Sequence, residues 1–296
     1  MPTKPSSNIA ILTLTLAMLI WASSFIALKI TFQELHPAQV LFGRMLLASV
    51  FFVFMLRWMG RLNYQRGDWK LLLMMAIMEP CLYFIFESLA LQNTTASQAG
   101  VVTSLLPLLT AIGAYLVLDE RLHIRTWLGF AIAIVGAIIL SVAGDSSETA
   151  PNPMLGNFYE LLAMVCAAVY TLAVKHLVSR YSPLFLTALQ SWVGAIFFLG
   201  PAMYVPLPET ISTTSVVAVM YLGIIVSIGA YGLYNYSLTR VPATQASAFI
   251  NLIPVFTVII AFLVLGEYFN HTQFIACSVI IIGLYLSRTP KKQDLN

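Results

Sequence analysis

The sequence predicts an all-α membrane protein in which ten transmembrane helices form two inverted five-helix repeats. Three observations favour this fold class. Apolar residues dominate the composition, and one long stretch of sequence is repeated. A turn within this stretch carries basic residues in the first copy and none in the second. We expect the first repeat over residues 1–143, an outer linker over 144–154, and the second repeat with a cytoplasmic tail over 155–296.

The composition excludes an ordinary soluble protein. Hydrophobic residues make up 59% of the chain and charged residues only 9%, whereas soluble domains carry about 25% charged residues. The mean hydropathy is +0.87. Apolar runs of about 20 residues, enough to cross roughly 30 Å of hydrocarbon as a helix, recur along the sequence. The predicted spans are residues 9–30, 38–57, 69–91, 97–118, 124–143, 155–176, 184–205, 214–237, 243–265 and 272–288. The first span is too long for the apolar part of a signal peptide, so we expect it to remain as a helix.

A stretch of 41 residues is repeated at an offset of 147 residues without a gap. The copies run from Ala96 to Gly136 and from Ala243 to Gly283, and 14 of the 41 positions are identical. Each copy predicts an apolar helix with an internal proline, a short turn with a glutamate, and a second apolar helix. The upstream parts align at an offset of 146, which matches Lys29 to Lys175. Similarity over this length indicates a duplication.

Basic residues predict the orientation of the chain, because lysine and arginine concentrate in cytoplasmic loops. If the N-terminus lies inside, 13 of the 15 lysines and arginines fall in inner segments and none in outer loops. The sequence therefore predicts that both termini are cytoplasmic. The net charge of +3 is interpreted as part of this topology rather than as a sign of nucleic-acid binding.

The two repeats are expected to enter the membrane in opposite senses, because each contains an odd number of spans. The turn Asp119–Arg125 carries two arginines, while its counterpart Gly266–His271 carries no lysine or arginine. This difference fits an inner turn in the first repeat and an outer turn in the second. Transporters built from inverted repeats bind substrate near the middle of the membrane, between the repeats.

Two prolines stand at equivalent positions of the repeated helices. Pro107 and Pro254 each lie about eleven residues into a span, and each leaves one backbone carbonyl without its helical partner. We predict a helix kink at both positions. Inside a membrane, the freed carbonyl is tolerated where neighbouring groups satisfy it or where it faces a polar cavity.

Several segments resemble the EamA-type transporters of the drug/metabolite transporter superfamily. They are Trp21-Ala22-Ser23-Ser24-Phe25 with Lys29, Pro37 and Arg44, Leu89–Leu91 with Ala96 to Glu120, and Tyr236–Leu238 with Ala243 to Glu267. The resemblance covers nearly the whole chain. It implies a ten-helix carrier, monomeric or weakly oligomeric, whose central cavity moves small metabolites across a bacterial inner membrane, commonly outward. It implies no single substrate. Gly266 departs from Asp119 of the first turn, which we interpret as turn chemistry.

Glu79 is the ionisable residue that the sequence places deepest. Ionisable side chains within spans cost about 2.5–3.5 kcal/mol on insertion scales and mark function by default. Glu79 lies ten residues beyond Trp69, about 15 Å along a helix and hence near the membrane centre. The second repeat has Val226 here, so no shared structural need explains the acid. We predict that Glu79 binds a cationic group of the substrate or a coupling proton. The alternative is a protonated Glu79 bonded to a backbone carbonyl beside Pro80.

Arg44 and Glu87 both fall in the outer halves of their spans. An ion pair between them would offset both desolvation costs, so we predict a structural pair, with gating at the outer mouth as the alternative. Lys29 lies near the outer end of its span and is expected to reach water as an anchor. Glu160 lies near the outer end of its own span and is assigned no special role.

Further aromatic and amide side chains are expected at the depth of Glu79. Any one of them could serve packing alone, because a buried tyrosine or tryptophan usually finds a partner for its polar tip. Together with Glu79 and Asn251, we predict that they line a central cavity of mixed aromatic and polar character. They are Trp21, Tyr83, Tyr170, Tyr231, Tyr234 and Asn235.

The sequence offers no motif for other chemistry. It contains no G-x-x-x-x-G-K, H-E-x-x-H or G-x-S-x-G pattern, the signatures of nucleotide, metalloprotease and hydrolase sites. Cys81, Cys166 and Cys277 fall inside spans and are interpreted as small packing residues. We therefore predict no catalytic residue, metal or cofactor. The predicted function is a secondary transporter for an amino-acid-like or drug-like metabolite, with the bilayer as its other partner. The alternative is a membrane enzyme or an accessory scaffold protein without transport activity.

Overall fold

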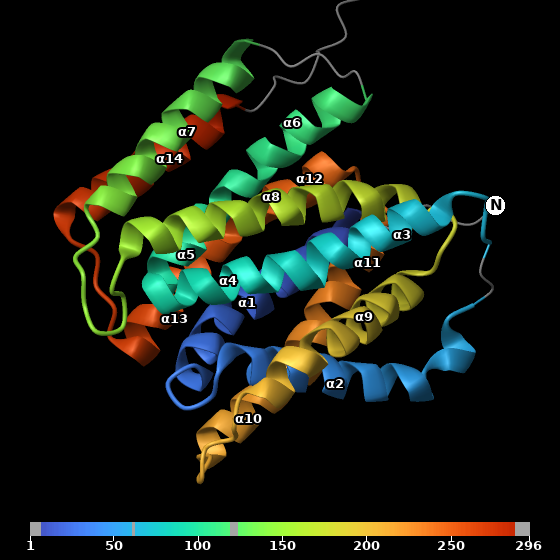
Figure 1. Cartoon of the computed structure of the whole chain (residues 1–296). Coiled ribbons are helices and arrows are strands. Elements are labelled where there is room, and N and C mark those ends of the chain that lie inside the picture. Colours follow the sequence, from blue (N-terminus) through green and yellow to red (C-terminus); the bar gives the residue numbers. More distant parts are fainter. Residues whose placement is uncertain (1–6, 61–62, 119–123, 288–296) are drawn as a thin grey trace, which may run out of the picture.

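The computed structural model describes residues 7–60, 63–118 and 124–287, and its regular elements are helices (Figure 1). In chain order they are α1 (Ser7–Thr31), α2 (Pro37–Phe54), η1 (Leu56–Trp58), α3 (Asp68–Ala76), η2 (Ile77–Leu82), α4 (Tyr83–Asn93), α5 (Ala96–Val102), η3 (Thr103–Leu105), α6 (Leu106–Leu118), α7 (Ile124–Val142), α8 (Pro153–Leu177), α9 (Pro183–Tyr204), α10 (Thr213–Tyr221), η4 (Leu222–Ala230), α11 (Tyr231–Leu238), α12 (Ala243–Ala248), η5 (Phe249–Asn251), α13 (Leu252–Leu265) and α14 (His271–Ser287).

Several of these elements follow one another without a break and form longer segments. Within the described residues, nine segments are long and apolar enough to cross a membrane, and α14 is a shorter apolar helix. The predicted all-α membrane fold is confirmed, whereas the tenth span stays a prediction. The turn Asp119–His123 and the two terminal tails, whose cytoplasmic placement the sequence predicts, lie outside the described residues.

Helix starts follow the local sequence at equivalent places in the two repeats. Pro37 and Pro183 each occupy the first turn of a helix, where a missing N–H costs nothing. The residue before each proline caps the helix. His36 accepts a hydrogen bond from the backbone N–H of Ala38, and Ser182 accepts one from that of Phe185. Such caps satisfy backbone donors that have no partner within the helix.

The helices α7 and α14 pack against each other through equivalent residues of the two repeats. A Cβ atom placed on Gly136 would lie 2.7 Å from a side-chain atom of Ile280 and 3.0 Å from the carbonyl oxygen of Ala276. A Cβ atom on Gly283 would lie 2.6 Å from both the Ala133 nitrogen and the Gly129 oxygen. Gly136, Ala133 and Gly129 match Gly283, Ile280 and Ala276 at the offset of 147. The contacts are thus reciprocal and antiparallel, as an inverted repeat requires.

Both repeated helices are interrupted just before their prolines. In the first, the 3₁₀ turn η3 separates α5 from α6, and in the second, η5 separates α12 from α13. The cause is the same in both, because a proline cannot donate to the carbonyl four residues back and its ring clashes with that carbonyl. The affected carbonyls belong to Thr103 and Ile250, which lie within the two 3₁₀ turns. The kinks predicted at Pro107 and Pro254 stay predictions.

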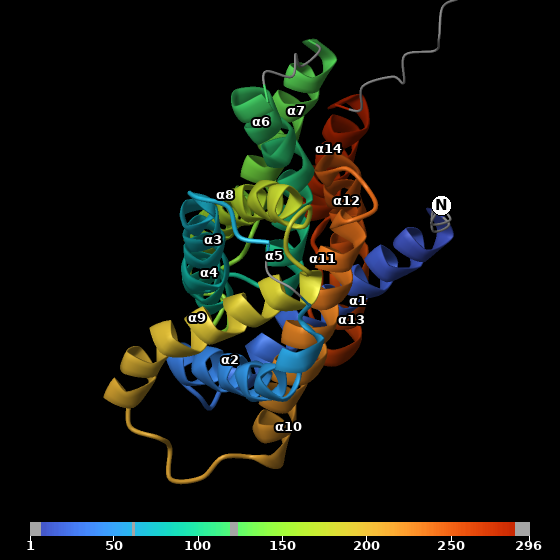
Figure 2. The same cartoon turned by 90° about the vertical axis from the view of Figure 1, so that its right-hand side faces the viewer.

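The centre of the bundle lies where α1, α4, α8 and α11 meet. In both views, α2, α9 and α10 gather at one end of the molecule, and α7 and α14 lie at the other (Figures 1 and 2). The helix α8 packs along α4 on one side and contacts α6 and α11 on others. Side chains from both repeats therefore converge between these helices, and the cavity described below lies there.

Lys29 differs from the sequence-based expectation. Its side chain is 9% exposed, and its ammonium group donates a 2.6 Å hydrogen bond to the backbone oxygen of Thr149, in the connection between the repeats. The equivalent Lys175 donates to the backbone oxygens of Leu238, the last residue of α11, and of Val241 just beyond it. Lys29 thus anchors the linker rather than reaching freely into water.

Candidate functional site

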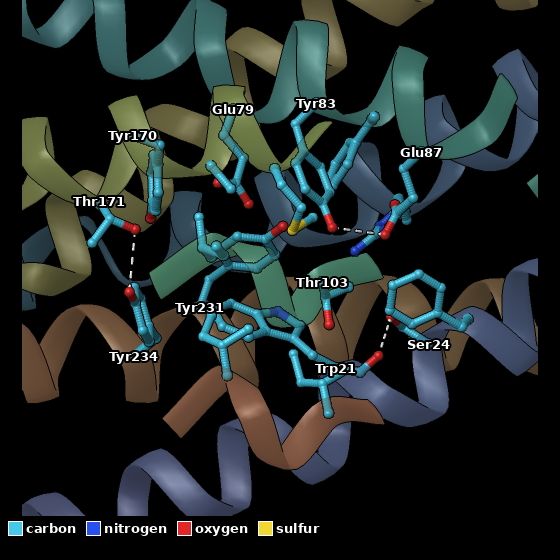
Figure 3. Close-up of a pocket in the computed structure, with 18 residues that line it drawn as sticks. Trp21, Ser24, Glu79, Tyr83, Glu87, Thr103, Tyr170, Thr171, Tyr231 and Tyr234 are labelled. Atoms are coloured by element: carbon cyan, nitrogen blue, oxygen red, sulfur yellow. Dashed lines mark hydrogen bonds between the residues drawn. The ribbon is translucent and has the colours of Figure 1, made fainter. Parts of the chain in front are cut away.

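A narrow cavity lies between the two repeats, with walls from α1, α2, α4, α6, α8, α11, α13 and the irregular turns η2, η3 and η5 (Figure 3). The volume open to the centre of a water molecule is about 40 Å³. One water needs roughly 10–15 Å³ by this measure, so the space holds only a few waters. Its lining residues are Trp21, Ser24, Phe25, Arg44, Glu79, Tyr83, Phe84, Glu87, Thr103, Leu106, Met164, Ala167, Tyr170, Thr171, Tyr231, Tyr234, Ile250 and Ile253.

The cavity contains most of the residues singled out from the sequence. Eight of them line its walls: Trp21, Arg44, Glu79, Tyr83, Glu87, Tyr170, Tyr231 and Tyr234. Asn235 and Asn251 are not among the lining residues. Asn235 lies behind the wall, fully buried, and Asn251 is partly buried with its side-chain oxygen unpartnered. The binding roles of all these residues remain predictions.

Glu79 enters the cavity where the helical backbone is interrupted. The residue has extended backbone angles, φ −146° and ψ 117°, inside the π-helical segment η2. Pro80 follows directly and cannot donate a helical hydrogen bond. The Glu79 side chain is 4% exposed and interacts with Tyr231 across the cavity. Figure 3 shows its carboxyl group directed into the space that Tyr231 and Trp21 border from the other side.

Arg44 and Glu87 share the cavity but form no direct salt bridge within 4.0 Å among the described residues. The Arg44 Nε atom donates to the hydroxyl of Ser227 at 3.1 Å, and its guanidinium group lies 4.3 Å from the centre of the Phe84 ring. Glu87 instead accepts a hydrogen bond from the hydroxyl of Tyr83 at 3.0 Å. The predicted pairing stays a prediction, now as an interaction of opposite charges across the cavity.

Aromatic rings form much of the remaining wall. The centre of the Trp21 ring lies 5.1 Å from that of Tyr231 and 5.0 Å from that of Tyr234. The indole N–H of Trp21 is buried and has no hydrogen-bond partner. A buried donor without a partner is costly, so this N–H is available to a molecule that enters the cavity.

Asn235 supports the cavity from behind. The hydroxyl of Tyr170 donates to the side-chain oxygen of Asn235 at 2.8 Å and lies 3.0 Å from that of Gln190. The amide group of Asn235 donates in turn to the Thr187 hydroxyl at 3.0 Å. These contacts fix the orientation of the Tyr170 ring. Asn235 therefore lies behind the Tyr170 ring in this conformation, and its predicted role in binding stays a prediction.

The lining follows the internal repeat. Fourteen of the 18 lining residues form seven pairs at the offsets of 146 or 147, namely Trp21 with Ala167, Ser24 with Tyr170, Phe25 with Thr171, Phe84 with Tyr231, Glu87 with Tyr234, Thr103 with Ile250, and Leu106 with Ile253. The pseudo-two-fold axis therefore passes through the cavity. Its charged residues, Arg44, Glu79 and Glu87, all belong to the first repeat, where the second has Gln190, Val226 and Tyr234. The site is symmetric in backbone and asymmetric in charge.

Sequence reasoning missed several wall residues, and the repeat itself could have found them. Ser24 and Phe84 are the counterparts of Tyr170 and Tyr231, which the sequence did single out. Thr103 lies four residues before Pro107, where the helix opens. Applying the repeat offset to Tyr170 and Tyr231 would have predicted Ser24 and Phe84. Thr103 could have been predicted because its carbonyl is the one that Pro107 leaves without a helical partner.

Glu160 is buried far more completely than its position near a helix end indicates. Its exposed fraction is 0%, and neither carboxyl oxygen has a hydrogen-bond partner. It is not among the residues that line the cavity. The sequence-based interpretation considered only its depth, whereas the side chain lies on the face of α8 that packs against α4.

A bundle of apolar helices, built from two inverted repeats around a central cavity of mixed aromatic and polar character, is typical of membrane transport proteins. The EamA-like transporter family model matches the chain twice, over residues 8–142 and 154–289. The chain belongs to the EamA-like transporter family, which confirms the resemblance noted from the sequence.

Named relatives agree with this membership, and a solved structure shares the fold. An "Uncharacterized transporter" of Archaeoglobus fulgidus is 30% identical over 95% of this chain and 98% of its own length. A "Probable terminal-alkyne amino-acid exporter" of Streptantibioticus cattleyicolor is 26% identical over 87% of this chain and 86% of its own. A solved structure titled "Crystal structure of protein" aligns with a TM-score of 0.69 at 18% identity, over 95% of this chain and 97% of the other. The last match shows the fold alone.

Proposed function

We propose that this chain is a secondary transporter that moves a small metabolite with both an amino group and an acidic or polar acceptor group, amino-acid-like or drug-like, out of the cell. The observation that carries the proposal is the cavity between the repeats, which presents acids, an arginine and an unpartnered indole N–H to the same space. Glu79 is the partner for a cationic group of the substrate. Arg44 and the N–H of Trp21 suit an acceptor such as a carboxylate.

Transport requires this cavity to widen. A space for a few waters cannot hold an amino acid, so we call the present conformation, in which the cavity is too narrow for such a substrate, closed. In an inverted repeat, each half can adopt the conformation of the other, which opens the site first to one side of the membrane and then to the other. The interrupted helices at η2, η3 and η5 border the cavity and are the places where such movement would bend the backbone.

The distribution of basic residues supports the proposed orientation of the carrier, and the family resemblance supports its proposed location. We place it in a bacterial inner membrane with both termini in the cytoplasm, as a monomer or weak oligomer. Cysteines introduced at Asp119 and Gly266 test this topology with a membrane-impermeant thiol reagent on intact cells. Position 266 should react from outside, and position 119 only after the membrane is opened. Reaction of both positions from the same side would contradict the inversion.

The function itself is tested by comparing metabolite efflux. Cells with and without the protein are loaded with a pool of isotopically labelled amino acids and amines, and the medium is analysed by mass spectrometry. Faster loss of one compound class from cells with the protein, abolished by Glu79→Gln at equal membrane abundance, is expected. Identical efflux for every compound in the pool would contradict export of amino-bearing metabolites. A membrane enzyme would instead change the compounds chemically, and a scaffold protein would change neither their amounts nor their identities.

A further inference from the structure

Glu160 is a buried acid that the substrate cavity does not use. It lies seven residues after the first residue of α8, about 10 Å along the helix axis, and therefore inside the hydrocarbon layer. Its side chain is 0% exposed, and both carboxyl oxygens lack a hydrogen-bond partner. An ionised carboxylate without partners is among the most expensive groups that a protein interior can contain. This position therefore accommodates the neutral acid and not the anion.

The surroundings of Glu160 offer no compensation for a negative charge. The charged neighbour that acts on it is another acid, Glu87 of α4, and Tyr83 of the same helix also interacts with it. Asn157, one turn earlier on α8, does not donate a hydrogen bond to Glu160, because its amide group donates to Gln98 at 2.9 Å and to Ser141 at 3.0 Å.

The other elements packed against α8 provide no positive charge that would compensate an ionised Glu160. Their ionisable side chains are Glu79 and Cys81 from η2, Tyr115 from α6, Tyr231, Tyr234 and Tyr236 from α11, Asp68 and Lys70 from α3, and Arg125 from α7. The described residues of α5, η3 and α12 include no ionisable side chain. Asp68 pairs with Arg180, which lies beyond the other end of α8. Arg44 of α2 acts on Glu79 and Glu87, the acids of the cavity.

We propose that Glu160 is a proton-binding site, separate from the substrate cavity, whose occupation by a proton holds α4 and α8 together in the closed conformation. When the two helices part and water reaches the carboxyl group, the proton leaves to water and the anion is solvated. Closing then takes up one proton, and the conformational equilibrium depends on pH.

The first test measures the proton directly. Purified protein in lipid nanodiscs is examined by infrared spectroscopy at neutral pH, where a protonated carboxyl group has a carbonyl band distinct from that of a carboxylate. Glu160→Gln should lower the intensity of the protonated-carboxyl band by the contribution of one carboxyl group. Glu209→Gln is the matched control, because Glu209 is an exposed acid outside the bundle interior, and it should leave the band unchanged. An unchanged protonated band in Glu160→Gln would overturn the proposal.

The second test measures the linkage between proton and fold. A folded state that binds a proton which the unfolded state releases loses stability as pH rises. The melting temperature of the wild type should therefore fall from mildly acidic to mildly alkaline pH, and Glu160→Gln should flatten part of that fall. Glu160→Met provides a second variant, since replacement of a neutral buried acid by an apolar side chain of similar shape should still fold. A wild-type pH dependence in both variants would contradict the proposal, whether or not transport is detected.

Discussion

Gly136 and Gly283, which occupy equivalent positions in the two repeats, each lie against the backbone of the other repeat's last helix. The contact is close because neither residue has a side chain, and small residues at such crossings let membrane helices approach. The reciprocity of this contact is the most direct structural sign of the duplication. It also makes the α7–α14 crossing sensitive to a single methyl group.

We predict that Gly283→Ala destabilises the protein. The added Cβ would lie 2.6 Å from backbone atoms of Ala133 and Gly129, which cannot rotate away. Overpacking of this kind costs about 1–3 kcal/mol, and the melting temperature in detergent should fall accordingly. Gly232→Ala is the matched control, because its Cβ would meet nothing within 4 Å and a helical glycine is replaced by a better helix former. Equal melting temperatures for the two variants would show that α7 and α14 do not pack this closely.

The fold could be predicted from sequence because its determinants are periodic and repeated. The offset of 147 predicts the inversion, and the apolar runs predict the helices to within a few residues, for example 184–205 against Pro183–Tyr204. Interruptions at Pro107 and Pro254 follow from proline chemistry. The extended conformation of Glu79 could not be predicted from Pro80 alone. The second repeat has an equivalent π-helical interruption, η4, which contains no proline, so proline chemistry does not by itself explain the interruption at η2.

The site could be predicted only in part, because depth along a helix does not give the direction of a side chain. Glu79, Tyr83 and Tyr231 were assigned by depth and do face the cavity. Asn235 has a similar depth, but its amide lies behind the Tyr170 ring. Glu160 was passed over by the same reasoning, although it shares a helical face with Asn157, Met164 and Ala167, which are all buried. A spacing of three or four residues along α8 would have indicated that face.

Arg44 and Glu87 provide a test of charge balance inside the membrane. We predict that Arg44→Ala or Glu87→Ala alone lowers the yield of folded protein, because each leaves an opposite charge buried with less compensation. The double substitution should recover part of the loss, because both desolvation costs disappear together. The yield is measured by fluorescence-detected size-exclusion chromatography. Losses that simply add in the double variant would mean that the two side chains do not interact across the cavity.

The indole N–H of Trp21 should contribute to substrate binding and not to folding. Trp21→Phe keeps an aromatic ring against Tyr231 and Tyr234 but removes the unpartnered donor. A hydrogen bond to a charged group contributes about 1.5–3 kcal/mol, so the apparent affinity for a transported compound should fall about 10- to 100-fold. Trp127→Phe, on the exposed side of α7, is the matched control and should leave affinity unchanged. Identical affinities for the two variants would remove Trp21 from the binding site.

Glu79 carries the sharpest prediction about mechanism. Its carboxyl group lies at the interruption of η2, 4% exposed, beside Tyr231 and opposite the arginine of the same cavity. Glu79→Gln keeps the shape and most of the hydrogen-bonding capacity but removes both charge and titration. If the residue binds a substrate cation or a coupling proton, the variant should reach the membrane at normal abundance while transport is lost or no longer depends on pH. The alternative, a neutral Glu79 bonded to backbone, predicts that glutamine replaces it with little effect on flux. The measurement is efflux of the compound identified from the labelled pool, at several external pH values, in wild type and variant at matched abundance. Glu209→Gln serves as the control for the same substitution at an exposed acid. Wild-type flux and pH dependence in Glu79→Gln would exclude Glu79 from the transport mechanism.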